Sequence, residues 1–164
     1  MAKKNLTITL YTSEIIYDVQ NKTFLTGRSR NIGTNHEEVA NMQANEDEEN
    51  ESQILRSIGS AFAYLKTRLS EYIEETATTA SNVLHSKDEN FTLALVLPSN
   101  VNQATSETIS SAAHQYIVNL AMGDWFTITN KADASDYIAK AESNLQELRE
   151  AINKRVRPVR QSIG

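Results

Sequence analysis

A periodic run of apolar residues over residues 52–85 constrains the fold of this chain more than any other feature. The apolar side chains recur at spacings of three and four: Ile54, Ile58, Phe62, Leu65, Leu69, Tyr72, Ile73, Ala77, Ala80 and Leu84. This spacing places them on one face of a helix of about nine turns, roughly 50 Å long. Ser52 is a suitable N-cap, and we expect either a kink near Thr76–Thr79 or a partner lying along the helix.

Residues 6–27 have the alternation of β-structure instead. Apolar side chains occupy every second position in two stretches, Leu6, Ile8 and Leu10 and then Ile15, Tyr17 and Val19. Phe24 lies in a third stretch that Gly27 ends. This pattern predicts a meander of two or three strands. A lone hairpin is marginal in water, so the meander must pack on the helices or on another chain.

A short apolar run at residues 91–97, Phe-Thr-Leu-Ala-Leu-Val-Leu, is closed by Pro98. Seven residues suit a buried strand better than a helix. We therefore predict that this strand pairs with the N-terminal meander.

Two more helices are predicted in the last third of the chain. The first covers residues 104–122, and Gly123 is placed to end it as a C′ residue. A short connection with Trp125 and Phe126 follows, and Asn130 can cap the last helix. The basic residues Lys154, Arg155 and Arg157 would form its last turn, and Pro158 prevents continuation. Trp125, Phe126 and Tyr137 are the predicted core anchors.

The predicted fold class is therefore mainly α with a small β element, a bundle of three main helices with one very long. Residues 28–51 read as a loop with a frayed helix from His36 to Ala44, then an exposed acidic linker. The chain divides into a β arm at 1–30, the acidic linker at 31–51, a helical body at 52–158 and a flexible tail at 159–164.

Composition argues against most kinds of active site. The chain has no cysteine, and its five glycines are never closer than six residues apart, which excludes a glycine-rich phosphate loop. The three histidines lie far apart and outside metal-binding motifs, and Glu74 and Glu75 point about 100° apart on a helix. No apolar run is long enough to span a bilayer. We predict no catalytic, cofactor-binding or metal-binding residues and a cytosolic protein.

The charge is unevenly placed, although the net value is −5. Residues 36–51 hold seven acidic and no basic residues, whereas four cations lie within residues 154–160. This basic run has three readings: a helix cap exposed to solvent, a contact with an acidic partner protein, or a salt-dependent contact with nucleic-acid phosphates. Opposite charges at separate ends also suit a ring in which one patch meets a different patch on the next copy.

An ordered series of short strings runs through the last third of the chain. The strings are Phe91–Pro98, Ala112–Val118, Asp124–Phe126, Ala134–Ile138 and Arg155–Pro158. This series resembles small virion proteins of tailed bacteriophages, of the head–tail connector (neck or adaptor) type, especially those of gut Bacteroidetes (crAss-like) phages. One departure is the stretch 36–51, which is richer in acids than a compact adaptor would need.

The resemblance implies a helical adaptor without catalytic residues. It would dock on the portal protein or a neighbouring ring in about twelve copies around a DNA channel, with non-specific DNA contact and no membrane. The protein would belong to the neck of the virion and reach it from the host cytoplasm. Small β elements and termini bridge neighbours in that family, which here implies residues 6–27 and 155–164.

The predicted interface residues follow from that role: Ile8, Leu10, Ile15, Tyr17, Val19, Phe24, Arg155, Arg157 and Arg160. If the arm pairs between chains, a chain without residues 1–27 would keep its helices and fail to assemble. The alternative is a cytosolic helical-bundle binding module, monomeric or dimeric, that recognises a protein through the Trp125 region or the basic tail. An enzyme with an unrecognised site is the third and weakest reading.

Overall fold

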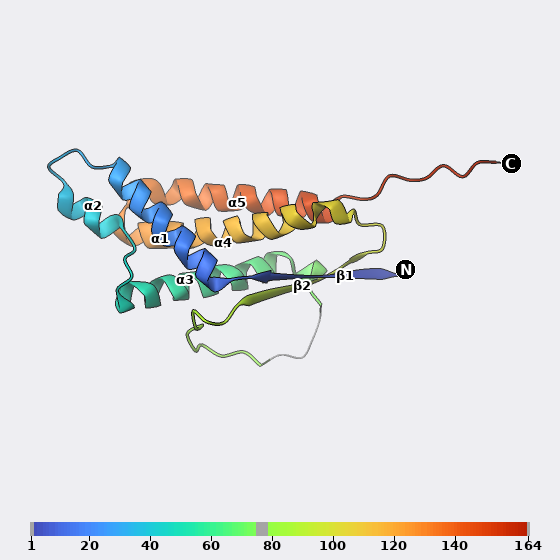
Figure 1. Cartoon of the computed structure of the whole chain (residues 1–164), viewed down its shortest axis with the longest axis horizontal. Coiled ribbons are helices and arrows are strands. Elements are labelled where there is room, and N and C mark those ends of the chain that lie inside the picture. The colour runs from blue at the N-terminus through green and yellow to red at the C-terminus, as the bar shows by residue number, and fades with distance from the viewer. Residues whose placement is uncertain (1, 75–78, 164) are drawn as a thin grey trace.

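The computed structural model describes residues 2–74 and 79–163, and it is mainly helical with one small sheet, as predicted (Figure 1). Its elements in chain order are β1 (Lys3–Leu10), α1 (Thr12–Ser29), α2 (His36–Met42), α3 (Glu48–Arg68), β2 (Phe91–Pro98), α4 (Ser106–Thr129) and α5 (Lys131–Asn153). Short 3-10 turns lie at Ser70–Tyr72 and Gln103–Thr105.

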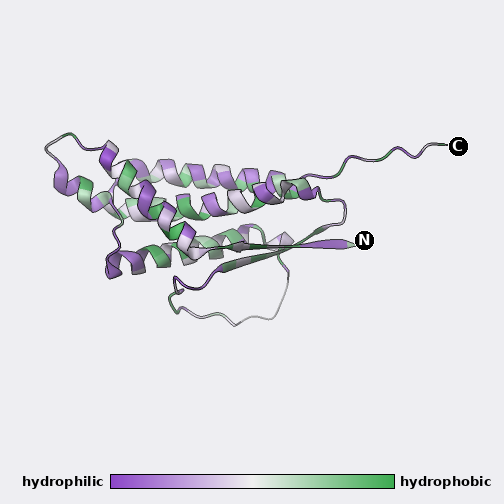
Figure 2. Ribbon diagram, viewed as in Figure 1, coloured by the Kyte–Doolittle hydropathy of each residue, from purple (hydrophilic) through white to green (hydrophobic). Residues whose placement is uncertain are grey.

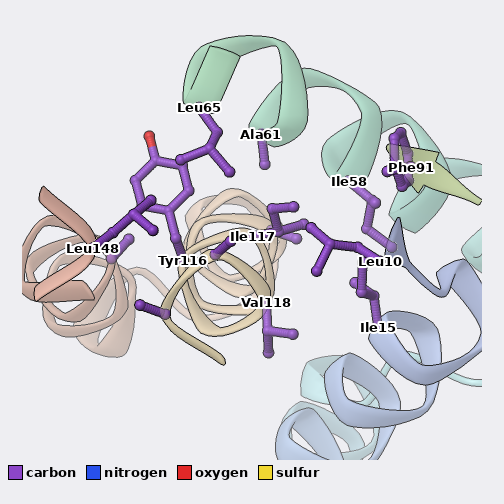
Figure 3. Close-up of a cluster of buried hydrophobic side chains, with 14 of the residues drawn as sticks. Leu10, Ile15, Ile58, Ala61, Leu65, Phe91, Tyr116, Ile117, Val118 and Leu148 are labelled. Carbon is purple, nitrogen blue, oxygen red and sulfur yellow. The ribbon is translucent and has the colours of Figure 1, made fainter. Parts of the chain in front are cut away.

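Helix α4 is the centre of the molecule, with α3, α5 and α1 packed around it (Figure 3). Three successive residues, Tyr116, Ile117 and Val118, leave α4 in different directions and are all buried. A helix that is apolar on several sides is typical of a core position. Each large apolar side chain buried there contributes about 1.5–3 kcal/mol to the stability of the fold.

The close contact between α4 and α5 explains why Gly123 does not end a helix. A Cβ atom on Gly123 would lie 2.7 Å from Cγ1 of Ile138, so the missing side chain lets the two helices approach. The prediction of a helix ending at residue 122, with Gly123 at C′ and Trp125 and Phe126 in a connection, is wrong. Helix α4 continues to Thr129, and Asn130 alone separates it from α5.

The sheet consists of β1 and β2 in antiparallel pairing, with Ile8 opposite Leu93 and Leu10 opposite Phe91. The predicted strand at 91–97 and its pairing with the N-terminal segment are confirmed. Because the two strands belong to one chain, the prediction that the arm pairs between chains is wrong. We now expect a chain without residues 1–27 to lose part of its core.

Residues 12–29 form helix α1, so the predicted meander is limited to its first strand. The buried residues of α1 recur at spacings of three and four along the helix: Thr12, Ile15, Ile16, Val19, Thr23 and Gly27. Ile15 and Val19 are also an even distance apart, which imitates the alternation of a strand. Tyr17 lies between them on the outer face and is 62% exposed.

Helix α3 is shorter than the predicted nine-turn helix and begins earlier. Glu48, Glu49 and Glu51 form its first turn, where they favour the positive end of the helix dipole; this is the hydrophilic end of α3 in Figure 2. The acidic segment is therefore partly the start of a helix, and Asp47, not Ser52, precedes it.

The apolar spacing continues beyond Arg68, but the chain turns toward the sheet. Leu69 is buried, Ile73 forms a bridge with Leu95, and the Glu74 amide donates to the Ala94 carbonyl at 3.1 Å. Pairing with the edge of β2 satisfies these backbone groups and takes the place of further helix. Part of the predicted kink at Thr76–Thr79 lies outside the described residues.

Helix α2 occupies residues 36–42, within the predicted helical stretch, and is held by Trp125 of α4. The indole Nε1 donates to the Met42 carbonyl at 2.9 Å. Trp125 is 7% exposed, Phe126 is fully buried, and the Phe126 ring lies 5.3 Å from that of Tyr137. These three aromatic residues join α2, α4 and α5 at one end of the bundle.

We predict that Trp125→Ala lowers the free energy of unfolding by about 3–5 kcal/mol, because it leaves a cavity and an unpaired Met42 carbonyl. Ile128→Ala is the matched control in the same helix, since Ile128 is 71% exposed. Its effect should stay within about 0.5 kcal/mol. Urea unfolding of the two variants measures both, and equal effects would contradict this packing.

Candidate assembly surfaces

Two of the three histidines, His85 and His114, have structural partners, whereas His36 is exposed at the start of α2. His114 Nε2 lies 2.6 Å from the Asp18 carboxylate and connects α4 to α1. His85 Nε2 lies 3.2 Å from the Thr12 hydroxyl, and its ring stacks on Phe91 at 4.0 Å. His85 therefore fastens the segment before β2 to the start of α1. These contacts make both rings part of the fold.

Among residues 2–74 and 79–163, no group of three or more His, Asp or Glu side chains is placed to hold a metal ion. No helix in the described part of the chain is long and apolar enough to cross a membrane. The absence of catalysis stays a prediction.

Four of the predicted interface residues lie in the chain's own core. Ile8 and Leu10 of β1 and Ile15 and Val19 of α1 are at most 6% exposed, so the prediction that they contact a neighbour is wrong. The spacing of these residues indicates that their side chains are buried. It does not indicate whether the same chain or a second chain covers them.

Tyr17 and Phe24, by contrast, lie on the outer face of α1. Together with Leu25 they form an exposed patch, here called the α1 patch, whose members are between 44% and 62% exposed. Aromatic residues are enriched where proteins meet. Tyr17 and Phe24 therefore remain candidates for a contact with another protein.

The inner side of α1 is fixed by polar contacts to α4 and α5. Thr26 Oγ1 lies 2.7 Å from the Tyr137 hydroxyl, and Lys22 Nζ donates to Gln115 at 2.9 Å. Arg30 at the end of α1 donates from Nε and from a second guanidinium nitrogen to the two carboxylate oxygens of Asp133, at 2.9 and 2.5 Å. These contacts hold α1 in one orientation, which leaves the α1 patch facing outward.

A second surface is a groove of about 440 Å³ over α4, between α3 and α5. It lies where Tyr116 of α4 reaches up between its two neighbours (Figure 3). Its apolar lining includes Ala61 and Tyr64 of α3, Leu120 of α4 and Ile138 of α5. Tyr64 and Ile138 are 63% and 42% exposed, so apolar surface is left open to solvent.

The groove carries two carboxylates with modest local partners. Asp124 accepts a hydrogen bond from Ser57 at 2.5 Å, and Glu142 pairs with Arg68 at 2.8 Å. Both acids are exposed, so each keeps oxygen lone pairs for a further donor. Burial raises the pKa of the Tyr116 hydroxyl, which keeps that group neutral. The groove thus has an apolar floor, with the Asp124 carboxylate at one edge and the Arg68–Glu142 ion pair at another.

The third surface is the C-terminal tail, residues 154–163. Helix α5 ends at Asn153, so the prediction that Lys154, Arg155 and Arg157 form its last turn is wrong. Arg155 forms a bridge with Val101, and the Val156 amide donates to the Asn100 carbonyl at 2.9 Å. Beyond Val156 the tail is exposed and leaves the end of the bundle (Figure 1).

The tail carries the last predicted interface residues. Arg157 and Arg160 are exposed, and so is Arg155, although its guanidinium donates to the Ile152 carbonyl at 2.9 Å. Val159 and Ile163 are at least 91% exposed. The groove was not predicted, because its lining comes from three helices. Tyr64 lies off the predicted core stripe of its helix, and the heptad-like spacing of the last helix placed Ile138 on the apolar stripe, although it is 42% exposed.

No family model, curated protein or solved structure matches this chain.

A pH dependence follows from the contact that fixes α1. Hydrogen bonds from Arg30 hold the pKa of the Asp133 carboxyl below its ordinary value of 3.8. The stabilisation is therefore fully present above that value and is lost as the pH falls through the lower, folded-state pKa. We predict that Asp133→Asn has a lower free energy of unfolding than the natural chain at about pH 7. This difference should become smaller toward about pH 2.5.

Urea unfolding across that range measures the difference. Glu147→Gln, an exposed change in the same helix, is the control and should show no narrowing. A difference for Asp133→Asn that stays constant with pH would contradict the role given to the Arg30 pair.

Proposed function

We propose that this protein is a structural subunit of the head–tail connector of a tailed phage. It would form part of a ring of about twelve copies that docks on the portal protein or an adjacent ring, and it would carry out no catalysis. The class comes from the strings at residues 91–98, 112–118, 124–126, 134–138 and 155–158, which resemble such proteins.

The observation that best supports an assembly role is the tail. Val159 and Ile163 are at least 91% exposed beside two exposed arginines, so the tail carries apolar and cationic side chains that the chain's own fold does not cover. A segment in which apolar side chains lie beside arginines can bind a partner surface that has both apolar side chains and carboxylates. The tail also begins at a fixed point, because residues 154–156 pair with residues 100–102.

The folded part of the chain, the residues before the tail, has the rigidity expected of a structural subunit. Its core is continuous from the sheet through α4 to α5, and four polar contacts hold α1 in place. The α1 patch faces away from α4 and provides a second surface for contact with another protein. Two distinct surfaces on one rigid body are what a closed ring with a docking partner requires.

The net charge of −5 fits a position beside packaged DNA. A wall of like charge does not bind the phosphate backbone, so DNA can pass. The cations of the tail would be occupied by protein carboxylates in an assembled ring, which leaves little attraction for DNA.

The test is co-expression of the full chain with the portal protein from the same genome, followed by size-exclusion chromatography and electron microscopy. We predict co-elution and an added ring of density on the portal. A matched chain with Tyr17→Asp and Phe24→Asp, two exposed changes on the α1 patch, should stay folded and lose at least ten-fold in portal capture. A natural chain that remains monomeric beside the portal and is absent from purified particles would overturn the proposal and favour the binding module.

A further inference from the structure

We propose that the groove over α4 binds the C-terminal tail of a second copy of this chain. The inference rests on the proposed ring and specifies the contact that would join its neighbouring subunits. Residues 157–160 of one copy would lie along the groove formed by α3, α4 and α5 of the next.

The chemistry of the two surfaces is complementary. The groove presents Tyr64, Leu120 and Ile138 as apolar contacts, and the tail of a second copy would supply Val159 as their apolar partner. Asp124 and Glu142 supply two carboxylates, whereas Arg157 and Arg160 supply two guanidinium groups. An arginine can bind a carboxylate through two parallel hydrogen bonds, which adds direction to the charge attraction.

The lengths also agree. Along α3 the groove runs from Ser57 to Tyr64, which is roughly 10 Å at 1.5 Å per residue. Four residues in extended conformation cover about 13 Å. Pro158 holds Arg157 in extended conformations, so the tail loses less conformational freedom when it binds.

The direction of the tail favours a neighbour over the chain's own groove. The groove lies over residues 116–127 of α4, whereas Val156 is bound to Asn100, before the start of that helix. From there the tail continues away from the bundle (Figure 1). To occupy its own groove it would have to reverse direction immediately after a residue whose amide is fixed.

The natural sequence has no cysteine, which allows a clean cross-linking test with full-length chains. One chain carries Val159→Cys in the tail, and a second, differently tagged chain carries Ser60→Cys at the groove. The matched control is Asn21→Cys on α1, which is also exposed and lies outside the groove. A short bis-maleimide is added to each mixture, and mass spectrometry identifies the linked peptides.

We expect the 60–159 link between differently tagged chains to form at least ten-fold more than the 21–159 link. Adding Arg157→Glu and Arg160→Glu to the tail chain should reduce it at least five-fold. Asp124→Asn with Glu142→Gln in the groove chain should do the same, because these changes keep the hydrogen bonds to Ser57 and Arg68 while removing the charge. Circular dichroism of each variant verifies the fold.

Two outcomes overturn the inference: equal yields at residues 60 and 21, or no 60–159 link between differently tagged chains. These outcomes are separate from failure of the connector proposal. A 60–159 link in purified protein that never joins a portal keeps the contact and removes the connector role. Capture by the portal without the link removes only the contact.

Discussion

The burial of α4 on several sides is the constraint on which the rest of the structure depends. A helix with apolar residues around much of its circumference needs neighbours in several directions, and α1, α3, α5 and β1 supply them. The missing side chain at Gly123 brings α5 close, and Trp125 brings in α2 through a backbone carbonyl. Each outer element therefore gains its position from its contact with α4.

The side of α4 between α3 and α5 is the exception. There the helix is covered only in part, and a groove with apolar walls and two carboxylates remains. Two small polar residues, Ser60 and Thr127, are part of the lining of this groove. The chain thus completes its own core and leaves two features unused, the groove and the tail. Their complementary charge and shape connect the fold to the proposed assembly.

The sequence was informative where one periodicity dominated. The strand at 91–97, the helical character of residues 106–122 and of α5, and the burial of Ile54, Ile58 and Leu65 all followed from simple spacing. It was misleading where two periods coincide: residues four apart in α1, such as Ile15 and Val19, satisfy both the helical and the strand pattern. Tertiary contacts decided the other cases. Ile73 continues the helical spacing of α3 but lies at the edge of β2, and Gly123 marks a close helix contact instead of a helix end.

The surfaces were harder to predict than the core. Tyr17, Phe24, Arg157 and Arg160 are exposed, yet the sequence grouped them with buried residues such as Ile15. Alternation shows that a side chain is covered, but not by which molecule. The groove needs α3 as well as α4 and α5, and α3 is distant from them in sequence, so no local pattern could reveal it.

The most direct test is amide hydrogen exchange of the free chain and of the assembled protein. It asks whether each chain completes its own core, and whether only the tail and the groove make contacts between copies. The expected result is strong protection of the β1 and α4 amides in the free chain, with assembly adding protection at residues 157–163 and around the groove. Rapid exchange of the β1 amides in the free chain, followed by protection only on assembly, would contradict it. That pattern would mean that β1 completes the core of a neighbour.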